Sequence, residues 1–280
     1  MPSLRREFHF IFGLREQTEP LHVLHYLCLA SCIAVNRPDA VNFHYRNEPF
    51  GPWWERIRPA LTLHRVADVT PDYAPQRYAD HAEGRFIAAQ GLGYAHEADF
   101  LRMDILLRHG GVYADMDSLF VQRYPDAWFE APFVIGEEDS PVIPGEILQP
   151  SLCNAVMFAQ PGAAFAQRWR ERMPQVFDGR WAEHSCREAG RLWRADPTSL
   201  RVLPSAYFYR YGSTIAGLRA LLEETDTPRA EDLYSVHLWA HLWWQQDRVD
   251  FSRVHADQID ETWLRERNCT LARLARQFLD

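Results

Sequence analysis

The first third of the chain alternates between short apolar runs and stretches of helically spaced apolar residues. Residues 7–13 form an aromatic run that ends in a glycine, which is typical of a buried strand. Residues 21–36 carry apolar side chains at helical spacing and stop before a proline. The pattern then predicts a strand at 41–45, a helix at 53–58 and a strand at 61–66. Because strands alternate with helices, we expect an α/β fold with a mostly parallel central sheet flanked by helices.

The rest of the chain continues this alternation less regularly. Residues 96–109 have the apolar density of a buried helix, and Gly110 and Gly111 end it because glycine readily adopts the left-handed turn that terminates helices. A short strand, residues 112–114, follows. The remaining predicted elements are strands at 133–136, 154–159 and 201–203, a helix at 163–173, loops at 68–93 and 135–150, and an arginine-rich amphipathic helix at 261–279.

The composition is that of an ordinary globular protein of 280 residues, 47% hydrophobic and 24% charged. A chain of this length buries enough surface to fold without a metal or disulfide staple. Thirty basic against 38 acidic residues give a formal net charge of −8, which argues against a binder of duplex nucleic acid. No signal peptide or transmembrane segment is apparent, which favours the cytoplasm.

All thirty basic residues are arginines, since the sequence contains no lysine. This excludes P-loop nucleotidases and pyridoxal phosphate enzymes, because both classes need a lysine. If a positively charged side chain of this protein binds phosphate, that side chain is an arginine or a histidine. The five cysteines are scattered without a C-x-x-C pair, so no structural zinc site or disulfide framework is expected.

The segment from Asp99 to Asp117 carries the most specific chemistry. Asp115 and Asp117 follow a predicted strand, at the sheet edge where open α/β folds bind ligands. Residues two apart on an extended chain point the same way, so both carboxylates can face one hard cation such as Mg²⁺ or Mn²⁺. Asp99 and Arg102 share a helical face, where Arg102 contacts phosphate or pairs with Asp99.

These features also have structural interpretations. An isolated D-x-D is most often a solvated acidic turn. The D-x-D of this chain is a more specific signal of a ligand site, because it follows a Gly-Gly-Val-Tyr strand. His237 and His241 are four residues apart, so they would share a helical face as zinc ligands or serve as structural histidines. The acidic residues 137–139 either contact an acceptor, act as a base or form a solvated charge run.

The same segment resembles the sugar-binding DXD region of family 32 glycosyltransferases, which are similar to the yeast initiating mannosyltransferase and to clostridial toxin catalytic domains. The matching residues are Asp99, Arg102, Leu106, Gly110, Gly111, Tyr113, Asp115 and Asp117, while Ala98 replaces the usual serine. The resemblance implies a GT-A (Rossmann-like) fold with an irregular helical C-terminal part. It also implies a single domain over residues 1–280, with a nucleotide-sugar-binding half (1–135) and an acceptor-side half (136–280).

The implied activity is that of a metal-dependent retaining glycosyltransferase, a hexosyltransferase of the kind used in polysaccharide biosynthesis. It would move a sugar from a UDP- or GDP-sugar donor to a hydroxyl of a glycan, lipid or other acceptor, with Mn²⁺ or Mg²⁺ as cofactor. Nucleic acid is not an expected partner, and peripheral membrane contact is compatible with the C-terminal helix.

Carried over residue by residue, the resemblance assigns Asp117 to the metal and Asp115 to the metal or the donor. Asp115, Asp117 and Arg102 form the expected catalytic set. Asp99 and Arg102 would bind donor sugar hydroxyls, and Tyr113 would support the nucleotide.

The resemblance extends more weakly to four other residues. Phe12 stands where relatives often have a tryptophan near the base, and Asn154 would contact donor or acceptor. His237 would complete the metal or diphosphate site, and Trp243 would lie over the diphosphate.

Two other functions stay open on the sequence alone. The D-x-D also resembles that of haloacid-dehalogenase-like phosphatases, although these usually need a downstream lysine that this chain lacks. The second alternative is a non-catalytic carbohydrate-binding protein on a transferase fold, because function does not follow from fold alone.

Overall fold

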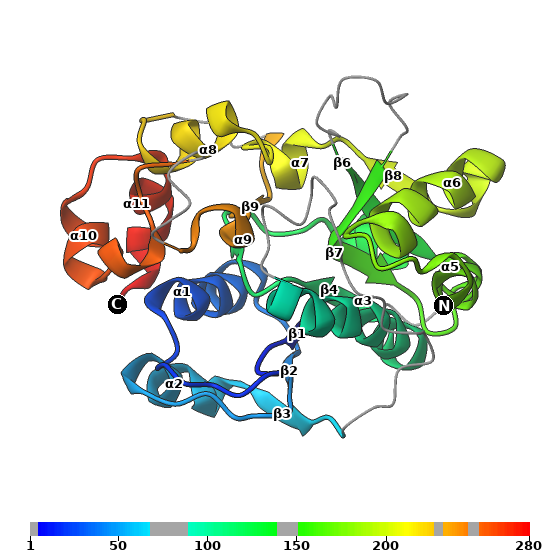
Figure 1. The fold of residues 1–280 in the computed structure, drawn as a ribbon, viewed down its shortest axis with the longest axis horizontal. Coiled ribbons are helices and arrows are strands. Elements are labelled where there is room, and N and C mark those ends of the chain that lie inside the picture. The colour runs from blue at the N-terminus through cyan, green and yellow to red at the C-terminus, as the bar shows by residue number, and fades with distance from the viewer. Residues whose placement is uncertain (1–4, 68–88, 139–150, 227–231, 246–251) are drawn as a thin grey trace.

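The computed structural model describes residues 5–67, 89–138, 151–226, 232–245 and 252–280. Its strands are β1 (Glu7–Ile11), β2 (Ala40–Tyr45), β3 (Thr62–Arg65), β4 (Gly111–Ala114), β5 (Ser118–Phe120), β6 (Phe133–Glu138), β7 (Ser151–Ala159), β8 (Arg201–Leu203) and β9 (Ser235–His237). A seven-stranded central sheet has the order β3-β2-β1-β4-β7-β6-β8, and β5 pairs with β9 in a separate sheet (Figure 1). Among these strands, β7 runs antiparallel to both of its neighbours, while the other central-sheet pairs are parallel. The expected α/β class with a mostly parallel sheet is confirmed.

Helices cover both faces of the central sheet and form the C-terminal part. They are α1 (Val23–Ser31), α2 (Pro52–Ile57), α3 (Ala89–His109), α4 (Asp126–Glu130), α5 (Ala164–Val176), α6 (Glu188–Ala195), α7 (Ala206–Tyr209), α8 (Ile215–Leu222), α9 (Ala240–Trp243), α10 (Glu261–Glu266) and α11 (Thr270–Ala275). Two π-helical turns, Cys32–Asn36 and Glu183–Arg187, follow α1 and precede α6. Helices α1 and α2 pack on one face of the sheet, and α3 and α5 pack on the other.

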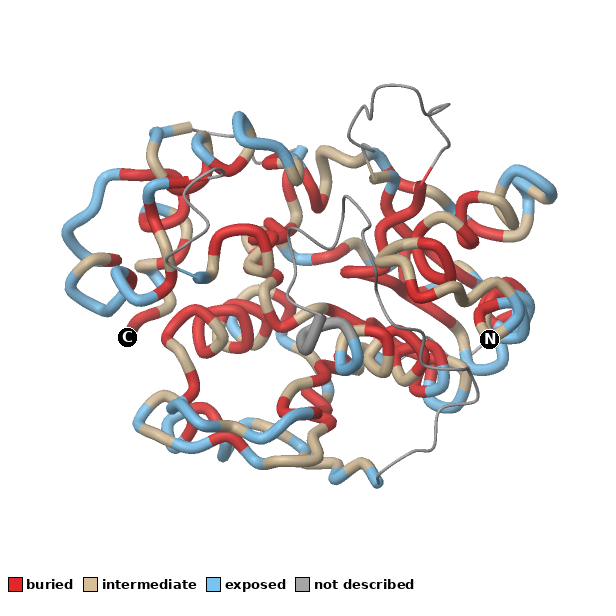
Figure 2. The backbone as a smooth tube through the Cα atoms, in the orientation of Figure 1, coloured by how far each residue is buried: buried red, intermediate tan, exposed pale blue. Residues whose placement is uncertain are grey.

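The sheet separates two hydrophobic cores, because successive side chains of a strand point to opposite faces. Phe8 and Phe10 of β1 are fully buried in the core that includes α1, whereas Ile11 packs in the core that includes α3. All residues of β7 are buried, as expected for a strand covered on both faces (Figure 2). Burying each phenylalanine contributes about 1.5–3 kcal/mol, so the strand ends are held by the packing beneath them.

Gly110 and Gly111 connect α3 to β4 in conformations that favour glycine. Their φ angles are 69° and 87°, in the left-handed region. A Cβ atom on Gly111 would lie 2.6 Å from the backbone oxygen of Glu7 on β1. The missing side chain therefore lets β4 pair closely with β1 and end where the D-x-D begins.

The prediction of one continuous helix at 261–279 is wrong. α10 ends at Glu266 and α11 begins at Thr270, because Arg267 between them is extended. The hydroxyl of Thr270 donates to the carbonyl of Ala220 (2.7 Å), which ties the second helix to α8. The tail therefore packs into the molecule as two short helices.

The bounds of two predicted loops also change. α3 begins at Ala89, before the predicted start at residue 96, and residues 68–88 of the predicted loop 68–93 lie outside the described residues. β6 continues to Glu138 and β7 starts at Ser151, so the predicted loop 135–150 shrinks to residues 139–150, which also lie outside. The short pair of strands β5 and β9 was not predicted, because three residues are too few to show an alternating pattern.

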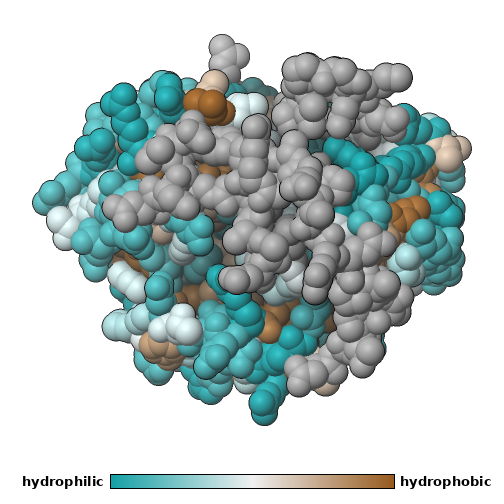
Figure 3. All heavy atoms as spheres, viewed as in Figure 1, coloured by the Kyte–Doolittle hydropathy of each residue, from teal (hydrophilic) through white to brown (hydrophobic). Residues whose placement is uncertain are grey.

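The described surface seen in Figure 3 is mainly hydrophilic, with apolar residues in small separate groups. Phe50, Tyr94 and Ile215 are the exposed large hydrophobic residues of the described part. No helix within the described ranges combines the length and the apolar character that crossing a membrane requires.

Candidate active site

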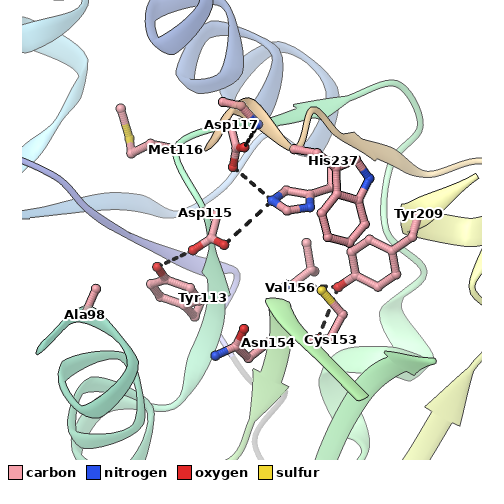
Figure 4. A network of polar contacts seen from close by, with 12 residues as sticks. Ala98, Tyr113, Asp115, Met116, Asp117, Cys153, Asn154, Val156, Tyr209 and His237 are labelled. Atoms are coloured by element: carbon pink, nitrogen blue, oxygen red, sulfur yellow. Dashed lines mark hydrogen bonds and ion pairs between the residues drawn. The ribbon is translucent and has the colours of Figure 1, made fainter. Parts of the chain in front are cut away.

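Asp115 and Asp117 lie in the turn that leads from β4 into β5. The backbone N–H of Asp115 donates to the Ala155 carbonyl of β7 (2.8 Å), and the N–H of Ser118 donates to the Asp115 carbonyl (3.0 Å). Both aspartate side chains point toward His237, while Met116 between them points away (Figure 4). This is the arrangement that the two-residue spacing predicts.

His237 reaches these carboxylates from a distant part of the chain. It ends β9, which pairs with β5 so that His237 lies opposite Ser118. Its Nε2 atom is 3.0 Å from Oδ1 of Asp117 and 3.8 Å from Oδ2 of Asp115. One ligand atom from each of the three residues lies within 4.8 Å of the others, which fits a single divalent ion. The suggested helical face shared with His241 is wrong, because His241 lies in α9 and His237 in a strand.

The chain after His237 wraps around Asp117. The N–H of Ala240 donates to Oδ2 of Asp117 (2.9 Å), and the N–H of Leu238 donates to its backbone carbonyl (2.8 Å). Trp239 makes this turn in the left-handed region, with φ 52°. Burial raises the pKa of Asp117, but the nearby His237 outweighs burial and lowers it overall. Burial likewise lowers the pKa of His237, and the two aspartates reverse this and raise it.

Arg102 connects the D-x-D turn to α3. Its buried guanidinium lies 3.3 Å from Asp115 and 3.2 Å from Asp99, and it donates to the Asn154 carbonyl (2.9 Å). The planar fork of arginine suits such simultaneous contacts, which an ammonium group cannot reproduce. It also lies over the ring of Tyr113, 4.6 Å from the centroid, and the Tyr113 hydroxyl donates to Asp115 (2.6 Å). Burial raises the pKa of Asp115, although Arg102 opposes this.

Asp99 has polar neighbours at both of its carboxylate oxygens. Oδ1 accepts a hydrogen bond from the Asn154 amide (2.7 Å) and faces Arg102, while Oδ2 lies 3.0 Å from Nε2 of His184. Burial raises the pKa of Asp99, but Arg102 and then His184 outweigh it, so the pKa is lowered overall. The structure thus joins Asp99, Arg102, Tyr113, Asp115 and Asn154 in one continuous network.

Phe12 lies beside the D-x-D turn through an aromatic contact. Its ring is 4.8 Å from that of His25, which also contacts the Met116 carbonyl through Nδ1 (3.2 Å). Trp244 stacks on His25 with a 4.9 Å separation and an interplanar angle of 13°. Burial lowers the pKa of His25 to about 4, so it is a neutral ring at ordinary pH. Phe12, His25 and Trp244 form an aromatic group next to the carboxylates.

The placement predicted for Trp243 requires a correction. Its side chain is fully buried, and its indole N–H donates to the Leu238 carbonyl (2.6 Å), so it faces the core. The neighbouring Trp244 is the partly exposed member of the pair. Because the two residues are adjacent and chemically identical, the sequence offers no basis for choosing between them.

The acidic run 137–139 divides in the structure. Glu138 is half-buried and accepts a hydrogen bond from the Ser151 hydroxyl (2.8 Å), and desolvation raises its pKa. Glu137 is exposed, and Asp139 lies outside the described residues. Glu138 is therefore a structural partner of β7 and not part of a solvated charge run.

Sequence reasoning missed His184 and His25. His184 lies in a π-helical turn within a stretch that shows neither helical nor strand periodicity, so no spacing pointed to it. His25 had a weak signal, because it interrupts an otherwise apolar helix three residues after His22.

Comparison with known proteins places this site in a family. Residues 42–134 match the family described as a glycosyltransferase sugar-binding region containing a DXD motif. Glucan organizing enzyme 1 of Cryptococcus neoformans var. grubii serotype A is 32% identical over 207 residues, which cover 72% of this chain and 52% of that protein. Residues 42–134 of this chain therefore carry the sugar-binding region of DXD-motif glycosyltransferases. The chain spans about half the length of this curated relative.

Solved glycosyltransferases resemble this DXD-motif chain only loosely. The PaToxG glycosyltransferase is 14% identical, with a TM-score of 0.46 over 69% of this chain and 70% of its own. The glycosyltransferase GlyE of Streptococcus pneumoniae TIGR4 is 12% identical, with a TM-score of 0.45 over 84% and 55% of the two chains. The phosphatase alternative is not favoured, since the D-x-D lies within the matched glycosyltransferase region.

Proposed function

We propose that this DXD-motif glycosyltransferase is metal-dependent and retaining, and that it moves a sugar from a UDP- or GDP-sugar to a hydroxyl of a glycan or lipid. The observation that carries the proposal is the convergence of Asp115, Asp117 and His237 at the end of the sheet. Glycosyl transfer from such a donor leaves a nucleoside diphosphate, whose charge must be neutralised as the C1–O bond breaks.

The three side chains fit an ion of the Mg²⁺ and Mn²⁺ class. Two carboxylates suit hard cations, and the imidazole favours Mn²⁺ over Mg²⁺ because nitrogen ligands suit transition metals better. The Tyr113 hydroxyl and the Ala240 N–H hold one oxygen of each carboxylate, which leaves the other oxygens facing His237. When bound, the ion would act as a Lewis acid on the diphosphate oxygens.

The remaining site residues orient the donor. We assign Asp99, Arg102, Tyr113, Asp115 and Asn154 to the donor site, with Arg102 fixing the position of Asp115 through their 3.3 Å contact. The buried network fixes these groups before the donor arrives, so no free energy is lost in ordering them during the reaction.

The aromatic group of Phe12, His25 and Trp244 is the proposed contact for the nucleotide base. Its rings lie beside the Met116 backbone, next to the metal ligands. Aromatic faces stack on any base, so this group favours nucleotide binding without choosing between uracil and guanine.

We divide the chain into a donor-binding half, residues 1–135, and an acceptor-side half, residues 136–280. The division cannot be strict, because Asn154 and His237 come from the second half and contact Asp99 and Asp117 of the first. Retention of configuration is part of the proposal through the family resemblance, and the anomeric signal of the product in proton NMR would test it.

A screen of nucleotide sugars tests the function. Purified protein is incubated with each UDP- and GDP-sugar, with Mn²⁺, with Mg²⁺ or with EDTA, and released nucleoside diphosphate is measured. We expect release from a small subset of donors that EDTA abolishes. A carbohydrate-binding protein without catalysis would instead bind glycan in calorimetry and release no nucleotide from any donor.

A further inference from the structure

A second group of metal-binding side chains lies outside the D-x-D turn. His96 and Asp99 are three residues apart on α3, and His184 comes from the π-helical turn Glu183–Arg187. All three residues are buried, and one ligand atom of each lies within 4.8 Å of the other two. Helix geometry places His96 and Asp99 on the same face of α3, turned toward His184.

His184 packs against the rings of Phe100 and Phe177, but these contacts do not satisfy its two ring nitrogens. Its side chain has no exposed surface, and neither of its ring nitrogens makes a hydrogen bond of acceptable geometry. Nε2 lies 3.0 Å from Oδ2 of Asp99, but at an angle that a hydrogen bond does not use. A fully buried polar group without a hydrogen bond costs about 1–3 kcal/mol, so such groups usually have another partner.

The charge around Asp99 is compatible with an ion on the side of His184. Arg102 and Asn154 approach Oδ1, and His184 approaches Oδ2, so the two sides of the carboxylate have separate partners. Arg102 is also paired with Asp115, which reduces its repulsion of a second cation.

We propose that His96, Asp99 and His184 bind a second divalent ion, Zn²⁺, which is distinct from the ion of the D-x-D turn. Two imidazoles and one carboxylate are a typical zinc ligand set, with Zn–N and Zn–O distances of about 2.0–2.2 Å. In a tetrahedral site the ligand atoms are then about 3.4 Å apart, which is compatible with the spacing here. The ion joins α3 to the segment before α6 and fixes the carboxylate of Asp99, so its role is positional.

The first experiment removes the D-x-D ion so that only the second site is measured. The variant Asp115→Asn/Asp117→Asn is loaded with Zn²⁺ alone, desalted, and analysed for metal content by mass spectrometry. We expect about one zinc per chain to remain, because the second ligand set is intact. A protein that retains no zinc after equimolar loading overturns the proposal.

In the second experiment, His184→Gln is added to the Asp115→Asn/Asp117→Asn protein, and His109→Gln is added to it separately as the matched control. His109 is an exposed histidine outside both ligand groups. The His184 variant is expected to lose zinc retention at least tenfold, while the control keeps it. Equal retention in the two variants contradicts the assignment.

A spectroscopic measurement covers the case in which the His184 variant does not fold. X-ray absorption at the zinc edge of the Asp115→Asn/Asp117→Asn protein should show imidazole scattering from two histidines and a first shell near 2.0–2.1 Å. A zinc shell without imidazole would place the ion elsewhere and refute the site.

Discussion

Nε2 of His237 lies 3.0 Å from Oδ1 of Asp117, although 119 residues separate the two in the sequence. The pairing of β5 with β9 creates this contact, because it places His237 opposite Ser118, the residue after Asp117. The small second sheet thus brings an imidazole nitrogen next to two carboxylates that follow a strand of the central sheet.

Replacing His237 tests whether this contact belongs to a metal site. His237→Gln should weaken Mn²⁺ binding at least tenfold, since the amide is a poorer ligand for a transition metal than imidazole. Isothermal titration of Mn²⁺ measures the change, with His109→Gln as the control because His109 is exposed and outside both ligand groups. Unchanged Mn²⁺ affinity in the His237 variant would exclude this histidine from the ligand set.

Arg102→Lys should be far from conservative. Lysine cannot contact Asp99, Asp115 and the Asn154 carbonyl together, so buried acidic groups would lose their partner. We expect a loss of about 3–5 kcal/mol in the free energy of unfolding, which urea denaturation would measure. The control is Arg168→Lys, because Arg168 is a more exposed arginine with a single long contact to Asp196. A loss as small as that of the control would show that the network contributes little.

Gly111→Ala and Gly93→Ala should change stability in opposite directions. A Cβ at Gly111 would meet the Glu7 oxygen at 2.6 Å with φ at 87°, so alanine there forces β4 away from β1. We expect the free energy of unfolding to fall by about 1–3 kcal/mol, which is the strain energy of an unfavourable backbone conformation. Gly93 lies in α3 with open space around it, so alanine should stabilise by about 0.5–1 kcal/mol. Thermal unfolding of both variants distinguishes these signs, and a destabilised Gly93 variant would contradict the account.

A buried row of histidines should make the protein sensitive to acid. Nδ1 of His9 lies 3.1 Å from Nε2 of His44, and His64 stacks on His44. Burial, with the neighbouring histidines, lowers the pKa of His44 to about 3 and of His9 to about 4. Both are neutral in the folded state, so the unfolded state binds more protons below pH 6.5. Stability is therefore fully present above about pH 6.5 and falls as the pH drops toward 4.

His44→Gln measures the contribution of one member of this row. Each such histidine adds about 1.4 kcal/mol per pH unit to the acid loss of stability. Urea unfolding between pH 7 and 4 should show a shallower slope for the variant than for the parent. Identical slopes in parent and His44 variant would show that this histidine titrates normally in the fold.

The fold was predictable where the hydrophobic pattern is long. The runs at 7–13 and 41–45 became β1 and β2, and the dense apolar segment before Gly110 became α3. Short elements carry too few residues for a periodic signal, which explains why β5 and β9 were missed. The broken C-terminal helix shows the reverse case. Its apolar spacing continues across Arg267, but Thr270 forms hydrogen bonds with α8 and with the turn after it, and the helix is interrupted before this residue.

In the candidate site, only the residues that lie close together in the sequence could be predicted from spacing. Asp115 and Asp117 follow from their position after β4, and Asp99 and Arg102 from their helical spacing. His237 and Asn154 come from far along the sequence and were reached through the family resemblance, whereas His184 had no signal of either kind. The burial of Trp243 and the partial exposure of Trp244 could not be predicted either, because only packing distinguishes the two.

The most direct test of the central claim is the rate of Mn²⁺-dependent nucleotide-sugar hydrolysis by Asp117→Asn, compared with Asp257→Asn. Asp257 is an exposed aspartate outside the site, and the substitution is chemically the same. We predict that the Asp117 variant loses at least a hundredfold in rate at saturating Mn²⁺ while it keeps its fold by circular dichroism, and that the Asp257 variant keeps the parent rate. Full hydrolysis by a folded Asp117 variant would contradict the account.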